Sequence, residues 1–243
     1  MCYNVEYIEG RVEKYKQRYP DIIPPDWNDG GLFDVVTPYY FVSGFSHPKL
    51  PIVKSDGVFL YEWGLIPLWA KDITIANDIR NKTLNAVGET VFEKPSFRKS
   101  IVNKRCLLGI NGFYEWRDFN GRKYPYHIRA KGDELFSLGC IYENWVDKST
   151  GEIRDTFSIL TTPANPMMEK IHNIKKRMPL IISRNDESKW VDPKLSTENI
   201  QSLIKPYPES EMEAYTISTD ANSARKNRNT PEILAPVTYS ELN

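Results

Sequence analysis

Cys2 follows Met1 directly, and this position gives it chemistry that no internal cysteine has. Once Met1 is removed, which a small second residue permits, Cys2 presents an α-amine and a thiol on adjacent carbons. An α-amine has a pKa of roughly 7.7–8.0, so part of it is the neutral nucleophile at neutral pH. Such a group attacks an aldehyde through nitrogen to form an imine, and its sulfur then closes a thiazolidine ring. The alternative reading is that Cys2 merely follows the start codon.

A carboxylic acid stands in an aromatic segment, GFYEW (112–116), which is predicted to form a central strand. The alternation of side chains along a strand places Glu115 on the same side as Phe113 and Arg117. Among apolar and aromatic groups the charged form of a carboxyl is disfavoured, which suits a general acid or base. The alternative is a solvated carboxylate that pairs with Arg117 or Lys123.

His172 is a further candidate for proton transfer and is one of three histidines in the chain. It lies on a helix that is predicted to begin at Asn165, where a capping side chain precedes a first-turn proline. An imidazole titrates near neutral pH and can move protons, although a helical histidine is also a common surface or core residue. The neighbourhoods of His47 and His127 suggest no chemistry.

Asn85 follows a polar segment, DIRNKTLNAVGET (78–90), that is predicted to be a helix end. Its side-chain amide can orient a sugar or an oxyanion. An asparagine at such a place is also a common helix cap.

Aromatic and basic residues are interleaved near these motifs. A groove for single-stranded nucleic acid stacks bases on aromatic side chains and holds phosphates with cations. The alternatives are that the aromatic residues fill the core and that the basic runs are solvated. The candidate DNA-binding residues are Trp63, Pro67, Trp69, Arg98, Lys175, Lys176 and Arg177.

Composition excludes several classes of protein. The 243 residues contain 32 Lys and Arg and 32 Asp and Glu, so the net charge is zero and bulk positive charge does not bind polynucleotide. The cysteines, Cys2, Cys106 and Cys140, have no CxxC spacing, so neither a disulfide framework nor a thiolate zinc site is expected. Neither a metal nor an organic cofactor is indicated. With no apolar run of ~18 residues and no signal peptide, we expect a cytoplasmic protein.

The elements that must position these residues are mostly strands. Asn120-Gly121 between two alternating segments predicts a β-hairpin with a type I′ turn. There is no GxGxxG or Walker loop, so dinucleotide and P-loop chemistry have no support. Many strands and few helices predict a single α+β domain over 1–243. The predicted strands are 57–63, 106–110, 113–119, 122–130, 136–142, 156–162, 179–183 and 214–219, and the predicted helices are 9–19, 95–104 and one that begins at 165.

Taken together, these segments resemble the SRAP family of SOS-response-associated peptidases and abasic-site-processing proteins. The resemblance implies a small barrel-like core of mixed, mainly antiparallel strands with surrounding helices, and a DNA groove that leads to the N-terminus. The matching segments are Met1-Cys2, WGLIPLWAKD (63–72), LNAVGET (84–90), RCLLGINGFYEW (105–116), TTPANPMMEKIH (161–172), KKRMPLII (175–182) and ANSARKNRNTPEIL (221–234).

The resemblance also implies a reaction and a role for each residue. Cys2, freed by self-removal of Met1, traps the ring-opened aldehyde of an abasic site in single-stranded DNA. Glu115 is then the acid or base near the imine, His172 moves a proton at the sugar hydroxyl, and Asn85 holds the sugar or the Cys2 amine. Such proteins are described as peptidases because Met1 is lost and as lyases because the imine permits strand cleavage. A monomer without a cofactor is expected.

The chain departs from the family pattern at three places. The family commonly begins Met-Cys-Gly-Arg, whereas Tyr3 and Asn4 follow Cys2 here. The family's Asn-Ala-Arg run has Val87 in place of its arginine. His172 precedes Arg177 by five residues where the family spacing is two. The two missing arginines predict weaker DNA binding unless Arg98, Lys175 or Lys176 compensates.

Two other functions share these residues. A peptidase that acts on other proteins would use Cys2 as nucleophile and its α-amine as base. A non-catalytic reader of modified or single-stranded DNA would use the aromatic and basic residues alone, with Cys2 incidental.

Overall fold

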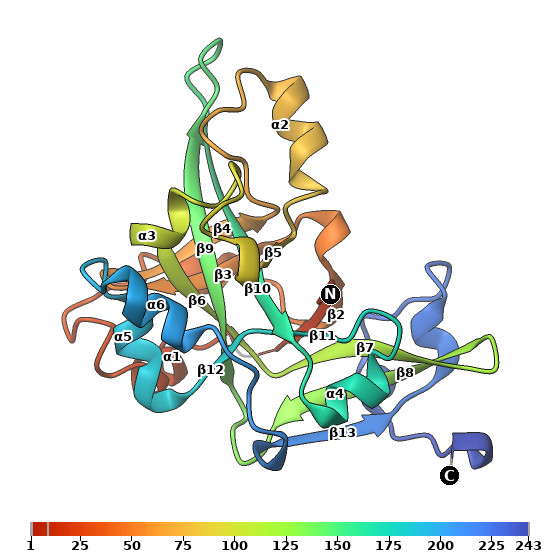
Figure 1. Ribbon diagram of the computed structural model, residues 1–243. Helices are drawn as coiled ribbons and strands as arrows, with labels where there is room; N and C mark the ends of the chain where they lie inside the picture. The colour runs from red at the N-terminus through yellow and green to blue at the C-terminus, as the bar shows by residue number, and fades with distance from the viewer. Residues whose placement is uncertain (1, 9, 243) are drawn as a thin grey trace.

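A computed structural model describes residues 2–8 and 10–242 of the chain (Figure 1). The strands are β1 (Asn4–Tyr7), β2 (Tyr39–Ser43), β3 (Lys49–Lys54), β4 (Gly57–Trp63), β5 (Asn85–Val87), β6 (Arg105–Ile110), β7 (Gly112–Phe119), β8 (Arg122–Ala130), β9 (Phe136–Val146), β10 (Ile153–Pro163), β11 (Arg177–Pro179), β12 (Ile181–Ile182) and β13 (Met212–Thr216). The α-helices are α1 (Val12–Arg18), α2 (Ile73–Arg80), α3 (Ser100–Asn103), α4 (Pro166–Ile171), α5 (Glu187–Val191) and α6 (Thr197–Leu203).

Five strands of the larger sheet close into a barrel. In the order β10-β4-β3-β6-β9 each strand pairs with the next, and β9 pairs back with β10. All of these pairings are antiparallel except β10 with β4, which is parallel. The short strands β5, β11 and β12 extend this sheet from β10 and β9. The predicted α+β class with a barrel-like core of mainly antiparallel strands is therefore confirmed.

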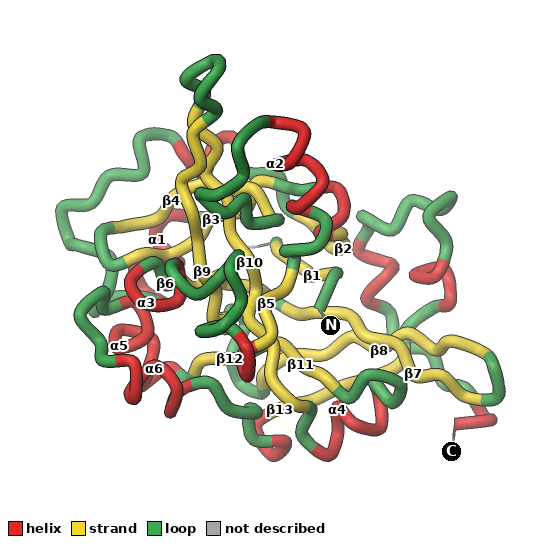
Figure 2. The backbone as a smooth tube through the Cα atoms, turned by 45° about the horizontal axis from the view of Figure 1, so that its top comes forward, coloured by secondary structure: helices red, strands yellow, loops and turns green. Residues whose placement is uncertain are grey.

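The second sheet has the order β13-β8-β7-β1-β2 and is antiparallel throughout. Its β7–β8 hairpin turns at Asn120 and Gly121, whose φ angles are 51° and 75°. Two positive φ angles are what a type I′ turn requires, so the predicted hairpin is confirmed. Figure 2 shows the N-terminal segment between this sheet and strands β5 and β11 of the other one.

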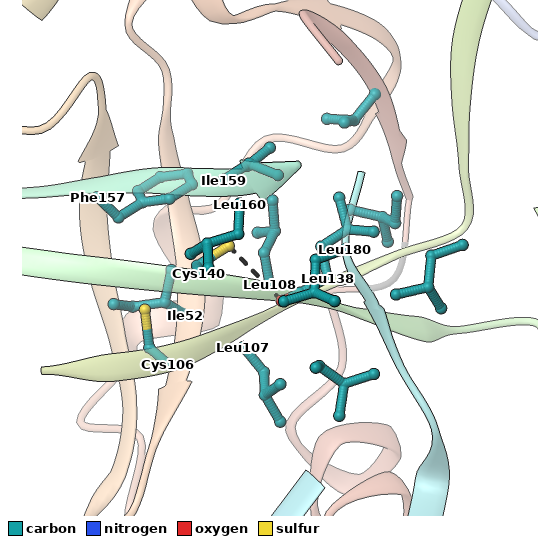
Figure 3. Packing of buried hydrophobic residues seen from close by; sticks show 14 of the residues in the cluster. Ile52, Cys106, Leu107, Leu108, Leu138, Cys140, Phe157, Ile159, Leu160 and Leu180 are labelled. Carbon is teal, nitrogen blue, oxygen red and sulfur yellow. Dashed lines mark hydrogen bonds between the residues drawn. The ribbon is translucent and has the colours of Figure 1, made fainter. Parts of the chain in front are cut away.

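The core is built from the inward faces of the barrel strands (Figure 3). Every residue of β6 is buried, because that strand has neighbours on both edges and side chains against both faces. Cys106 and Cys140 are opposite each other on β6 and β9 and are both free thiols in this core. Helices α3, α5 and α6 lie beside one another over one side of the barrel (Figures 1 and 2).

Several predicted elements differ in extent. The expected helix over 95–104 is helical only at α3, and the expected strand 179–183 is divided into β11 and β12 at Leu180. Helix α4 begins as predicted, because the Asn165 side chain accepts a hydrogen bond of 2.9 Å from Met168 N and Pro166 occupies its first turn. Within the described residues, no helix is long and apolar enough to cross a membrane.

Candidate active site

Cys2 is fully buried next to the start of β1 in the second sheet, and it contacts Asn85 of β5 in the larger sheet. The Asn85 side chain donates a hydrogen bond of 2.8 Å from Nδ2 to the Cys2 carbonyl oxygen. Burial raises the pKa of the Cys2 thiol, and the negative charge of Glu115 adds to this effect. The sulfur is therefore a protonated thiol at neutral pH, and it needs a base before it can act as a nucleophile.

Glu115 lies on β7 beside the same residues. Val5 pairs with Phe113, and the antiparallel register extended by two residues places Tyr3 opposite Glu115. The Glu115 side chain is 4% exposed, and its burial raises its pKa to about 7, against the opposing charge of Lys175. At neutral pH the carboxyl is thus present in both protonation states, as an acid–base catalyst must be.

His172 faces Glu115 from the turn after α4. Its Nε2 atom lies 3.8 Å from Glu115 Oε2, and its Nδ1 atom lies 2.9 Å from the Arg177 carbonyl oxygen. Because a carbonyl only accepts hydrogen bonds, Nδ1 carries the proton and Nε2 is the unprotonated ring nitrogen. Burial, aided by the Lys175 charge, lowers the pKa of His172 to about 4. The imidazole is therefore a neutral proton acceptor at neutral pH.

The five-residue spacing from His172 to Arg177 is accommodated by a turn. Helix α4 ends at Ile171, and Lys176 N then donates to the His172 carbonyl oxygen at 2.8 Å. Lys176 takes a positive φ of 49°, which reverses the chain so that Arg177 can begin β11. The longer connection is thus a loop, and it leaves the imidazole beside Glu115.

Asn85 does not cap a helix, so that alternative reading is wrong. It begins β5, where it pairs with Ile159 of β10, and its side chain is buried against Cys2. Its Oδ1 atom is also buried and has no hydrogen-bond partner among the described residues. The acceptor oxygen of this amide can therefore receive a further donor at Cys2.

A cavity of about 400 Å³, called here the Glu115 cavity, is lined by Glu115 and His172 but not by Cys2 or Asn85. Tyr3 and Asn4, which directly follow Cys2, form part of its wall. A larger cavity of about 720 Å³ contains none of the predicted site residues. The residues that line the Glu115 cavity are Tyr3, Asn4, Glu115, Trp116, Lys123, His172, Lys175, Ala221, Asn222 and Arg228.

The predictions that Trp63 and Pro67 contact DNA are wrong, because both residues are buried. The Trp63 indole stacks on Phe157 with 6.1 Å between ring centres, and its Nε1 donates to the Leu84 carbonyl oxygen at 2.8 Å. Trp69 is 47% exposed, so it is the tryptophan of this segment that can reach a ligand.

The predicted cations occupy different environments. Lys175 lines the Glu115 cavity, whereas Arg98 and Lys176 are exposed residues outside its wall. Arg177 is held within the protein, because its Nη2 donates to Glu89 Oε2 and to the Thr161 carbonyl oxygen, each at 2.8 Å. These hydrogen bonds hold the pKa of Glu89 below its usual value. DNA contacts by Trp69, Arg98, Lys175, Lys176 and Arg177 remain predictions.

Two features were not assigned from the sequence. The C-terminal segment provides Ala221, Asn222 and Arg228 to the cavity wall, and its signals were its basic residues and its resemblance to the family at 221–234. His127, which was given no chemical neighbourhood, is buried with its Nε2 2.6 Å from Glu6 Oε2. Within residues 2–8 and 10–242, no group of three His, Cys, Asp or Glu side chains could hold a metal ion.

Comparisons with known proteins match most of the chain. The family model described as SOS response associated peptidase (SRAP) matches residues 46–224. The abasic site processing protein YoqW of Bacillus subtilis is 41% identical over 209 residues, which cover 80% of this chain and 89% of YoqW. The abasic site processing protein HMCES of Xenopus tropicalis is 29% identical, over 89% of this chain and 71% of HMCES.

A crystal structure of a protein from Bacteroides thetaiotaomicron has a TM-score of 0.89 to this chain and 39% identity. The match covers 98% of this chain and 100% of that one. A second solved structure, of a protein from Bordetella bronchiseptica, is 16% identical with a TM-score of 0.72 and shares the fold. The extent of the family match and the identity to YoqW show that this chain belongs to the SRAP family.

Proposed function

We propose that this protein processes abasic sites in single-stranded DNA by forming a covalent thiazolidine link through Cys2. The observation that supports this most directly is the approach of Glu115 and His172 to 3.8 Å beside buried Cys2. With a pKa of about 7, Glu115 can both give and take a proton at neutral pH. With a pKa of about 4, His172 is neutral and can accept a proton. The names of the relatives support the same substrate.

The abasic sugar must first open, because its cyclic hemiacetal has no carbonyl. Nε2 of His172 takes the proton of the C1′ hydroxyl while the bond from C1′ to the ring oxygen breaks. The proton then passes to that oxygen, which becomes the 4′ hydroxyl. This step yields the aldehyde at C1′ and returns His172 to its neutral form.

The α-amine of Cys2 then adds to C1′ to give a carbinolamine. Protonated Glu115 gives its proton to the departing hydroxyl, so water leaves and an iminium ion forms. Oδ1 of Asn85, which has no described partner, is placed to accept a hydrogen bond from the amine before attack. The amine thus needs to be neutral and the carboxyl protonated in the same step.

Ring closure uses the thiol. The Glu115 carboxylate takes the proton of Sγ, and the sulfur adds to the iminium carbon while the C=N electrons return to nitrogen. A neutral thiazolidine results, and Glu115 is again protonated. Because the protein and the DNA together lose one water, the adduct mass is the sum of the two masses minus water.

The reaction requires the α-amine of Cys2 to be free, which needs hydrolysis of the bond between Met1 and Cys2. We assign this self-processing to the same Glu115, acting as a base for water.

The test is incubation of the purified protein with single-stranded DNA that carries one abasic site. A band that survives heating in detergent, with the mass given above, is expected from the wild type and not from Cys2→Ala. Lack of a stable band from the wild type, or the same band from Cys2→Ala, would overturn the proposal. Turnover of a generic peptide mixture would instead favour a peptidase. Binding that is unchanged in Cys2→Ala, with no covalent product, would favour a non-catalytic reader.

A further inference from the structure

Three cations from distant parts of the chain meet at the Glu115 cavity. Lys123 is on β8, Lys175 follows α4, and Arg228 is in the C-terminal segment. Within the described residues, no carboxylate oxygen lies within ion-pair distance of any of these three side chains. The cavity's own acid, Glu115, has its pKa raised to about 7. The cavity is therefore positive at neutral pH, although the whole chain has no net charge.

Arg228 is the least expected of the three, because it is partly buried. Its guanidinium carbon lies 4.4 Å from the centre of the Phe41 ring, and Nη1 reaches the Ala221 carbonyl oxygen at 3.4 Å. Burial lowers the pKa of Arg228. A guanidinium has five N–H donors, and the described contacts use one of them together with the cation's attraction to the ring. The remaining donors of this desolvated cation are suited to an anion.

One residue of the wall that carries Arg228, Asn222, is hydrogen-bonded to the β7–β8 hairpin. Asn222 accepts a hydrogen bond of 2.5 Å from Trp116 Nε1 and donates one of 2.9 Å from Nδ2 to the Lys123 carbonyl oxygen. The backbone of Lys123 and the C-terminal segment are thus joined before any ligand binds. Such preorganisation reduces the entropy cost of binding.

We propose that Lys123, Lys175 and Arg228 bind a backbone phosphate next to the abasic sugar. This inference rests on the proposed function for the identity of the sugar. A phosphodiester flanks an abasic sugar on each side, so a cation cluster at the mouth of the sugar cavity meets one of them. Arg228 lies outside the residues 46–224 that match the family model.

The first experiment measures binding without chemistry. Single-stranded DNA with one tetrahydrofuran residue mimics the abasic sugar but has no hydroxyl at C1′ and cannot form an aldehyde. Affinities of the wild type, Lys123→Ala, Lys175→Ala and Arg228→Gln are measured between 50 and 200 mM salt. Each variant should bind about fivefold more weakly at low salt. Each should also reduce the slope of log K against log salt by about 0.7, the value for one contact to single-stranded DNA.

The matched control is Lys148→Ala, which removes the same charge from an exposed lysine in the β9–β10 turn. Figure 1 shows this turn at the opposite end of the molecule from α4 and the β7–β8 hairpin. The slope of log K against log salt for Lys148→Ala should equal that of the wild type. Arg228→Lys keeps the charge without the planar fork, so it should recover the slope but only part of the affinity.

The second experiment locates the phosphate. A neutral methylphosphonate is placed on the 5′ or the 3′ side of the tetrahydrofuran residue, one at a time. At one of the two positions it should weaken wild-type binding about fivefold and have little further effect in Arg228→Gln, because the contact is already lost.

The outcomes separate this inference from the proposed function. If all three variants keep the wild-type slope while the natural abasic site still crosslinks to Cys2, the phosphate site is wrong and the function stands. If the wild type forms no crosslink but the variants lose slope on tetrahydrofuran DNA, the phosphate site stands and the function is wrong. If Lys148→Ala reduces the affinity and the salt slope as much as the three variants do, the phosphate site is also overturned, because the effect is then one of general charge.

Discussion

Glu115 Oε2 lies 3.8 Å from His172 Nε2, although the two residues are 57 positions apart and belong to different elements. Burial acts on the two groups in opposite directions, since it raises the pKa of the carboxyl to about 7 and lowers that of the imidazole to about 4. At neutral pH the pair is therefore a partly protonated acid beside a neutral base. Neither group needs a full charge in the cavity before the reaction begins.

Cys2→Ser separates the two bonds of the proposed adduct. The variant keeps the α-amine after Met1 is removed, so the imine can form, but its hydroxyl is too poor a nucleophile to close a stable ring. We expect an adduct that is lost on heating and is retained after borohydride reduction. Cys106→Ala, a change at another buried cysteine, is the matched control and should retain the heat-stable adduct. A heat-stable adduct from Cys2→Ser without reduction would contradict the role of sulfur.

The rate of crosslinking at saturating DNA should depend on pH with a maximum near 7. Below the maximum the α-amine is protonated, and above it Glu115 loses the proton that removes water, with its pKa of about 7. Glu115→Gln should slow the reaction at least about 100-fold, the usual contribution of a general acid. The substitution should also remove the decline of the crosslinking rate at high pH. If the rate of Glu115→Gln still declines at high pH, another group causes the decline.

Glu115 should also destabilise the protein at high pH. Its pKa is raised on folding, so its contribution to the free energy of unfolding is full below the unfolded pKa and is lost as pH rises to about 7. The loss is on the order of 3 kcal/mol for this buried group. Glu115→Gln should therefore have a higher Tm than wild type at pH 8 and a smaller difference at pH 5. Glu93→Gln, at an exposed glutamate, should show no such pH-dependent gain.

His172→Ala tests ring opening on its own. The proposed proton transfer by Nε2 is needed only while the sugar is cyclic. We expect the variant to crosslink more slowly to a natural abasic site, by about 10-fold to 100-fold, and at the wild-type rate to an acyclic aldehyde in the same strand. Equal slowing on both substrates would mean that His172 acts on the aldehyde or only positions Glu115.

The hairpin turn should carry a measurable share of stability. Gly121 has a φ of 75°, and a Cβ atom at this position would meet nothing within 4 Å. The cost of Gly121→Ala is therefore backbone strain alone, about 1 kcal/mol in the free energy of unfolding. Chemical denaturation of Gly121→Ala and of Gly132→Ala, another open glycine with positive φ, should show similar losses. A loss only in Gly132→Ala would contradict the role of the type I′ turn.

Local signals in the sequence predicted local structure well. Asn120-Gly121 specified a turn that only positive φ angles permit, and Asn165 specified the first turn of α4 through one side-chain hydrogen bond. The aromatic neighbours of Glu115 indicated a buried carboxyl but left a solvated one open, and the structure shows that it is buried.

The features that local sequence patterns did not predict depend on pairing between strands far apart in the chain. Asn85 is in a strand because three residues of β5 pair with β10, more than 70 positions later, and no local pattern reports such a short strand. Trp63 is buried because β4 pairs with both β3 and β10 as the barrel closes, whereas a strand pattern alone does not say which aromatic residues face inward. The position of Arg228 on Phe41 is likewise non-local, since the neighbouring Asn229 Oδ1 accepts a hydrogen bond of 2.7 Å from Tyr40 N.

The hydrogen bonds of Asn222 also bear on when the protein becomes reactive. The wall of the Glu115 cavity includes both Tyr3 and Arg228, so its first and last contributors are separated by most of the translated message. A nascent chain on the ribosome already displays its second residue while the segment that completes the wall is still unmade. The wall of the cavity is therefore completed only near the end of synthesis, and a prematurely terminated product that lacks residues 219–229 would lack part of that wall.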